Sequence, residues 1–109
     1  MSASNSPLAY ADIRHLADRA LANGRGVMLR CHDLGESISQ RTRFYKMRDL
    51  DRRANKRTYP DPDHPMHGTS VYDSLVLSPC SELRDGETVT FLAFEVSSAE
   101  RLAERIEEL

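Results

Sequence analysis

The chain has 109 residues, of which 39% are hydrophobic and 29% are charged, and its formal net charge is −2. This length is close to the commonest size of one domain, and the composition is too apolar for a disordered chain. Two cysteines are too few for a disulfide framework, no apolar run approaches the ~20 residues that span a bilayer, and the first residues do not resemble a secretory leader. We therefore expect a single domain over residues 1–109 in the reducing cytoplasm.

The first helix is predicted to start at Pro7 and to stop at Gly24. Ser6 is a suitable N-cap, proline is favoured at the first helical position, and glycine commonly ends a helix. Apolar residues recur in this segment with helical period: Ile13, Leu16, Ala17, Ala20 and Leu21. Residues 26–32 then alternate between two faces, which predicts a strand.

A second helix is predicted over residues 37–57, after a turn at residues 33–35. It should end before Tyr59-Pro60, because the residue before proline disfavours helical angles. Its core face is expected to carry Phe44, Met47 and Ala54. Residues 58–71 contain three prolines and a glycine and are expected to form a long, stiff loop. Loops of this length in compact domains are often functional.

Two strands, at about residues 73–78 and 88–96, are predicted to form an antiparallel hairpin around Asp85-Gly86. A final helix should open with a capping box, formed by Ser97 and Glu100. A helical crossover between the first two strands predicts that these strands run parallel. The expected fold class is α+β: one small domain of order α-β-α-β-β-α, with a three-stranded mixed sheet packed against helices.

No enzyme motif is visible in the sequence. The five glycines do not form a phosphate-binding loop, and no serine lies in a nucleophile elbow. The strongest candidate for a metal site is the loop pair His64 and His67, with Cys31, His32 or Cys80 supplied by the strands, but this spacing is not diagnostic. We therefore expect no catalytic activity, no cofactor and no metal.

The charged residues are distributed unevenly along the chain. Residues 41–60 carry eight basic and two acidic side chains, whereas residues 61–109 carry three basic and eleven acidic ones. Within the basic segment, five residues recur every three or four positions and are expected to share one helix face, opposite the core face: Arg41, Tyr45, Arg48, Arg52 and Lys56. The other cations widen this surface: Arg43, Lys46, Arg53 and Arg57.

Internal ion pairs cannot neutralise this basic helix. Asp49 is placed to pair with Arg53, four residues away, and Asp51 is placed to pair with Arg48, three residues away. Two carboxylates leave most of the eight cations without a partner. The helix is therefore expected to bind a polyanion, to contact an acidic protein surface, or to remain a solvated face.

The first functional hypothesis is a non-enzymatic protein that contacts nucleic acid or a nucleoprotein through the arginine-rich helix. The planar guanidinium suits phosphate and guanine edges, and Tyr45 can stack on an unpaired base. The alternative is a small inhibitor or accessory protein of a phage or other mobile element, of the anti-defence type, that docks on a host nucleic-acid-processing complex through its acidic and basic surfaces. The acidic side of that alternative is the C-terminal carboxylate group: Glu100, Glu104, Glu107 and Glu108. A homodimer that joins acidic and basic helices is a further option, and no membrane partner is expected.

Overall fold

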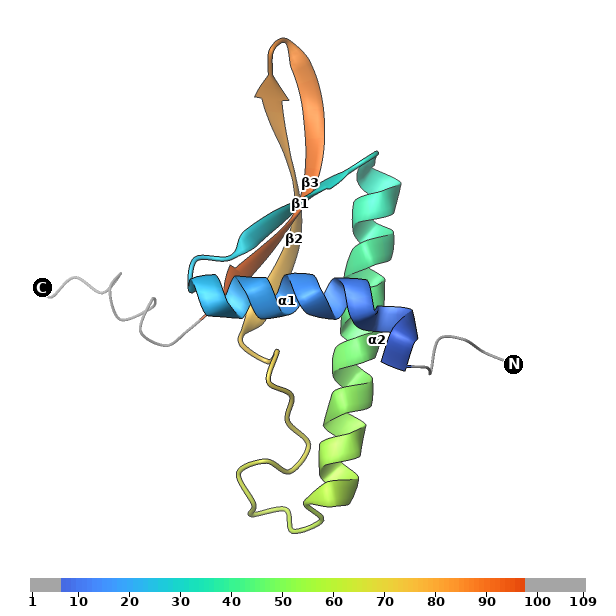
Figure 1. The fold of residues 1–109 in the computed structure, drawn as a ribbon, viewed down its shortest axis with the longest axis vertical. Helices are drawn as coiled ribbons and strands as arrows, with labels where there is room; N and C mark the ends of the chain where they lie inside the picture. The colour runs from blue at the N-terminus through green and yellow to red at the C-terminus, as the bar shows by residue number, and fades with distance from the viewer. Residues whose placement is uncertain (1–6, 98–109) are drawn as a thin grey trace, which may run out of the picture.

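The computed structural model of the protein describes residues 7–97 (Figure 1). A short 3-10 turn, η2 (Pro7–Tyr10), leads into α1 (Ala11–Asn23), β1 (Val27–Cys31), α2 (Leu34–Thr58), β2 (Leu75–Arg84) and β3 (Glu87–Val96). This confirms the α+β class and the predicted order from the first helix to the hairpin. The predicted final helix, with its cap partner Glu100, lies outside the described residues.

All pairing in the sheet is antiparallel, and the strand order is β1-β3-β2. Val27 of β1 lies opposite Phe94, and Leu75 of β2 lies opposite Val96. β1 and β2 therefore point in the same direction, as the helical crossover predicts, but they are not neighbours. The prediction of a mixed sheet was wrong because β3 occupies the place between them.

The side chains of the two hairpin strands explain this order. β3 is buried on both of its faces from Phe91 to Phe94, which suits the middle position in the sheet. Pro79 lies within β2 and lacks an N–H donor, so β2 belongs at an edge of the sheet. Because an edge strand tolerates the missing N–H of proline, β2 continues through Pro79 to Arg84, beyond the predicted end at residue 78.

The hairpin turn consists of Asp85 and Gly86, as predicted. Both residues have positive φ angles, 51° and 81°. This is the pattern of a two-residue type I′ turn, whose twist matches that of the flanking strands. The turn fixes the register in which Arg84 lies opposite Glu87.

α2 begins three residues before the predicted start, because its cap is Asp33. The Asp33 carboxylate accepts a hydrogen bond from the Glu36 N–H at 2.8 Å, and the Glu36 carboxylate accepts one from the His32 N–H at 2.9 Å. The Glu36 N–H is one of the donors that the first turn of a helix leaves unpaired, and the bond from the His32 N–H ties the residue before the cap to the same turn. The turn predicted at residues 33–35 is therefore the start of the helix, which ends at Thr58 before Tyr59-Pro60 as predicted.

The core lies between one face of the sheet and the two helices, which cross each other (Figure 1). Phe44 and Met47 of α2 are fully buried, as predicted. The ring of Phe44 meets those of Tyr72 and Phe94 edge to face, with centroids 6.2 and 6.0 Å apart. These contacts set the rotation of α2 about its axis, and so decide which of its cations reach the surface.

Candidate anion-binding site

The predicted basic stripe of α2 lies beside the core face and not opposite to it. Successive residues of an α-helix are rotated by about 100° around its axis. Arg48 follows Phe44 by four residues and therefore lies only about 40° from it around the axis. Arg41, Tyr45, Arg48 and Arg52 are accordingly half-buried, and Lys56 is the one exposed member of the stripe. The Nε atom of Arg48 is buried and has no hydrogen-bond partner among the described residues. The exposed cations of α2 are Lys46, Arg53, Lys56 and Arg57.

Three arginines of α2 form ion pairs. Arg53 pairs with Asp49 within the helix, at 3.0 Å, as predicted. Arg52 pairs with Asp73 at 2.7 Å. The third pair, Arg43 with Asp12 of α1, measures 2.8 Å, and its hydrogen bond lowers the pKa of the Asp12 carboxyl.

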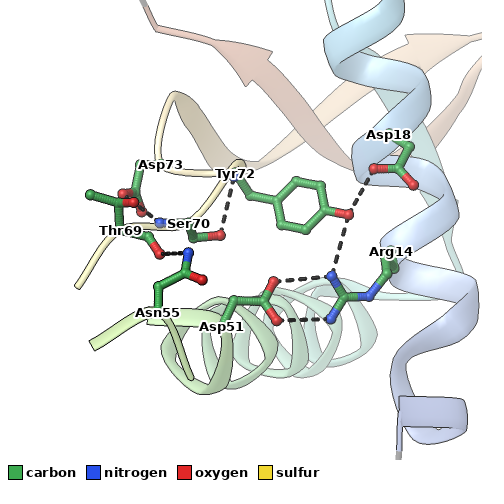
Figure 2. A network of polar contacts seen from close by, with 8 residues as sticks. All are labelled: Arg14, Asp18, Asp51, Asn55, Thr69, Ser70, Tyr72 and Asp73. Carbon is green, nitrogen blue, oxygen red and sulfur yellow. Dashed lines mark hydrogen bonds and ion pairs between the residues drawn. The ribbon is translucent and has the colours of Figure 1, made fainter. Parts of the chain in front are cut away.

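The predicted pair of Asp51 with Arg48 is wrong. Asp51 lies on the side of α2 that α1 crosses, and it forms a two-pronged ion pair with Arg14 of α1. Its two carboxylate oxygens lie 3.0 and 3.1 Å from the two terminal nitrogens of Arg14 (Figure 2). Arg48 instead stacks on Tyr45, with its guanidinium carbon 4.7 Å from the ring centroid. One face of Tyr45 is thus covered, and stacking of a base on this residue stays a prediction.

Five cations of α2 have no ion-pair partner within residues 7–97: Arg41, Lys46, Arg48, Lys56 and Arg57. They extend from the first half of the helix to its last turn. At about 100° per residue, Arg41, Arg48 and Lys56 fall on one side of α2, and Lys46 and Arg57 fall on another. The helix therefore carries positive charge on two sides that its own described carboxylates leave unneutralised.

A groove of about 520 Å³ opens between the C-terminal half of α2 and the segment that follows the helix. We call it the helix–loop groove; its lining residues are Asp49, Arg52, Arg53, Lys56, His67 and Gly68. Three permanent cations and one histidine thus face a hollow that has one carboxylate in its lining. Sequence periodicity placed Arg52 and Lys56 on one helix face and Arg53 beside it, and the structure brings His67 next to these three cations.

The two loop histidines have different surroundings. His67 Nδ1 lies 2.6 Å from the Tyr59 carbonyl oxygen, so this nitrogen carries the proton and donates it. The His64 ring lies outside the groove lining and stacks on Tyr59, with centroids 4.5 Å apart. Within residues 7–97, no group of three or more His, Cys, Asp or Glu side chains is placed to hold a metal ion.

The two cysteines have different environments in the sheet. Cys31 and Cys80 are both free thiols. Cys31 is buried on the helix-facing side of β1, and this burial raises the pKa of its thiol. Neither residue lies in the helix–loop groove.

A polar network holds the wall of the groove against both helices (Figure 2). The Tyr72 hydroxyl donates to Asp18 of α1 at 2.7 Å, and it accepts from Arg14 at 3.4 Å. The Asn55 amide of α2 donates to the Thr69 carbonyl at 2.7 Å. Sequence reasoning missed these residues because each bond joins segments far apart in the chain, and no local pattern indicates such a partner.

The surroundings of Tyr72 favour a structural role for this network. Burial, followed by the hydrogen bond to Asp18, raises the pKa of the Tyr72 hydroxyl. The neutral phenol is therefore the form that the fold favours. The network orients the segment that precedes β2. The groups of the groove that can bind an anion are therefore its cations.

Comparison with protein-family models, curated proteins and solved structures finds no match for this chain. Neither helix within residues 7–97 has a stretch long and apolar enough to cross a membrane. The acidic group of the second hypothesis lies outside the described residues: Glu100, Glu104, Glu107 and Glu108. What the described residues define is a small α+β domain whose longest helix carries a basic surface and one wall of a basic groove.

Proposed function

We propose that this protein is a non-enzymatic nucleic-acid-binding protein that contacts the phosphate backbone with α2. The observation that supports the proposal most directly is that five cations of α2 have no ion-pair partner within residues 7–97. They are spread along the helix from Arg41 to Arg57, over two of its sides, which suits an extended anion better than a compact one. A nucleic-acid backbone is such an anion.

The net charge of the whole chain means that a polyanion can bind only at a local basic surface. A net charge of −2 gives no general attraction to a polyanion, so binding has to come from a region where the cations are concentrated. Residues 41–60 are that region. Six of their eight cations are arginines, which bind phosphate oxygens with two parallel hydrogen bonds.

The proposal is tested by fluorescence anisotropy at low salt, with one labelled oligonucleotide offered single-stranded and as a duplex. If four cations neutralise phosphates of the duplex, the logarithm of the affinity should fall against the logarithm of the salt concentration with a slope of about −3.6. Arg41→Ala and Arg57→Ala should each flatten this slope by about 0.9 if the residue contacts a phosphate. Arg19→Ala removes an exposed arginine from α1 and serves as the matched control.

Absence of binding to both oligonucleotides at tens of micromolar protein, the range of weak non-specific binding, would end the nucleic-acid proposal. The docking hypothesis would then be tested by reversing Glu100 and Glu104 to lysine. In that case capture of a basic protein partner should be lost, while changes to α2 arginines should have little effect.

A further inference from the structure

We infer that the helix–loop groove binds the sugar–phosphate backbone of an unpaired nucleic-acid strand, in preference to a duplex. This inference rests on the proposed function and adds to it the place of binding and the form of the nucleic acid. It depends on three features of the groove: the orientation of its arginines, the fixed position of its wall, and its concave shape.

The two arginines of the groove are oriented by carboxylates and still have free donors. Arg52 uses Nε and one terminal nitrogen on Asp73, at 2.8 and 2.7 Å. Arg53 uses one terminal nitrogen on Asp49. A guanidinium has five N–H donors, so each arginine retains donors for a phosphate oxygen. The carboxylates hold the side chains in place, which reduces the entropy lost on binding.

The charge of the groove suits a phosphodiester. Arg52, Arg53 and Lys56 contribute three positive charges, and the paired carboxylates Asp49 and Asp73 contribute two negative ones. One positive charge therefore remains when His67 is neutral. Each phosphodiester of a strand carries one negative charge, so one phosphate in the groove balances it.

His67 adds a group of a different kind. Because its Nδ1 donates to the Tyr59 carbonyl, Nε2 of the neutral ring is a hydrogen-bond acceptor. An acceptor among cations suits a hydroxyl or amino hydrogen of a nucleotide and does not suit a phosphate oxygen. The groove can thus bind a phosphate and also contact the sugar or base beside it.

The shape of the groove favours one strand. Its volume of about 520 Å³ falls within the ~300–1,000 Å³ of typical ligand sites, and a basic groove along the backbone is the usual device of single-strand binding proteins. A duplex presents its phosphates on a convex rod, and would meet the exposed outer side of α2, where Lys46 and Arg57 lie. The bond between Asn55 and the Thr69 carbonyl keeps the two walls of the groove in place.

The test uses two lysines that differ in position but not in charge. Lys56 lines the groove, whereas Lys46 is also exposed on α2 but lies outside it, and Lys56→Ala and Lys46→Ala remove the same charge. Anisotropy is measured with single-stranded DNA, single-stranded RNA of the same sequence, and the DNA duplex. The wild type should bind the single strands more tightly than the duplex. Lys56→Ala should weaken single-strand binding about 10-fold, and Lys46→Ala by much less.

Two further variants complete the design. Lys56→Arg retains the cation and should restore single-strand binding, and thermal unfolding of each variant checks that its fold is intact. If Nε2 of His67 accepts from the ribose hydroxyl, His67→Ala should weaken binding to RNA more than binding to DNA. If Nε2 accepts from a base, the variant should weaken binding to both equally. Either result supports the groove as the binding site.

The outcomes separate this inference from the proposed function. If the wild type binds oligonucleotides but Lys56→Ala and Lys46→Ala lose the same affinity, the groove is not the binding site and the proposed function remains. A wild type that prefers the duplex also overturns the inference alone. If the wild type binds neither form, both proposals fall.

Discussion

The ring of Phe44 has no exposed surface and meets three aromatic rings edge to face, those of Tyr45, Tyr72 and Phe94. Phe44→Ala should therefore lower the free energy of unfolding by ~3–5 kcal/mol, since it removes buried area and leaves a cavity. Urea denaturation followed by circular dichroism measures this loss. Arg57→Ala, on the exposed side of the same helix, should stay within about 0.5 kcal/mol of the wild type. Equal stability of the two variants would contradict the position of Phe44 in the core.

Tyr72 gives a prediction about alkaline pH. Burial and the bond to Asp18 raise the pKa of its hydroxyl above the ordinary value of about 10. The folded protein keeps this proton at a pH where the unfolded chain has lost it. The free energy of unfolding should therefore fall as the pH rises from about 10 towards the folded pKa, and this group should have no effect below that range.

Tyr72→Phe separates this contribution from those of other groups. At neutral pH the variant should lose about 1 kcal/mol of stability, because the hydrogen bond to the exposed Asp18 is removed. Above about pH 10 the difference from the wild type should shrink. Urea unfolding of both proteins between about pH 8 and pH 11 measures it. A difference that is constant over this range would show that Tyr72 does not couple folding to protonation.

Single residues of the site were predictable where the pattern is local. The eight cations of α2 follow from its sequence, and so does the pair of Asp49 with Arg53 one helical turn away. The partners of Arg43 and Arg52 were not predictable, because Asp12 and Asp73 lie 31 and 21 residues away along the chain. Their positions depend on how α1 and the segment before β2 pack on α2.

The connection between α1 and β1 contains a pair of glycines that can be compared directly. Gly24 and Gly26 both have positive φ angles, 73° and 100°. A Cβ on Gly24 would meet no atom within 4 Å, whereas one on Gly26 would collide with the Phe94 carbonyl oxygen on β3. Gly24→Ala should cost about 1 kcal/mol, the cost of a left-handed conformation for a residue with a Cβ.

Gly26→Ala should cost ~2 kcal/mol more than Gly24→Ala, because the collision is with backbone and forces β1 and β3 apart. Thermal and urea unfolding of the two variants give this difference. Equal losses would show that β1 does not approach β3 at this point.

The helices and strands were predictable from periodicity and caps, but their arrangement was not. Residues 37–57 were assigned to a helix from their pattern, and the structure extends it to Leu34–Thr58 because Asp33 caps it. The first strand of the hairpin was predicted to end at about residue 78, whereas β2 continues through Pro79 to Arg84, because the sequence does not show that β2 lies at an edge. The sheet order depends on long-range packing of β3, whose apolar residues alone do not identify their neighbours.

The helix–loop groove depends on contacts between α1, α2 and the segment before β2. The hydrogen bond from the Asn55 amide to the Thr69 carbonyl joins α2 to the segment before β2, and neither of its partners is charged. Asn55→Ala should raise amide hydrogen exchange in residues 59–74 and weaken oligonucleotide binding, although it removes no cation. The control is Asn23→Ala, which removes a similar amide-to-carbonyl bond, to Gly26 at 3.1 Å, on another part of the fold.

Exchange is followed by mass spectrometry on peptides from residues 59–74, and affinity by anisotropy. Unchanged exchange in Asn55→Ala would show that this bond does not hold the loop. Faster exchange with unchanged affinity would show that the loop is held but that its position does not matter for binding.

The place of β3 between β1 and β2 also governs the order in which the chain can acquire its structure during translation. α1, β1 and α2 leave the ribosome first, and the helices can form at once because their hydrogen bonds are local. β1 has to wait for the last described strand, since Val27 pairs with Phe94. Closing so long a loop is slow and happens only after the hairpin has been synthesised. Until then the apolar side of α2 has no sheet to cover it, and the nascent chain depends on its many charged side chains, or on chaperones, to avoid aggregation.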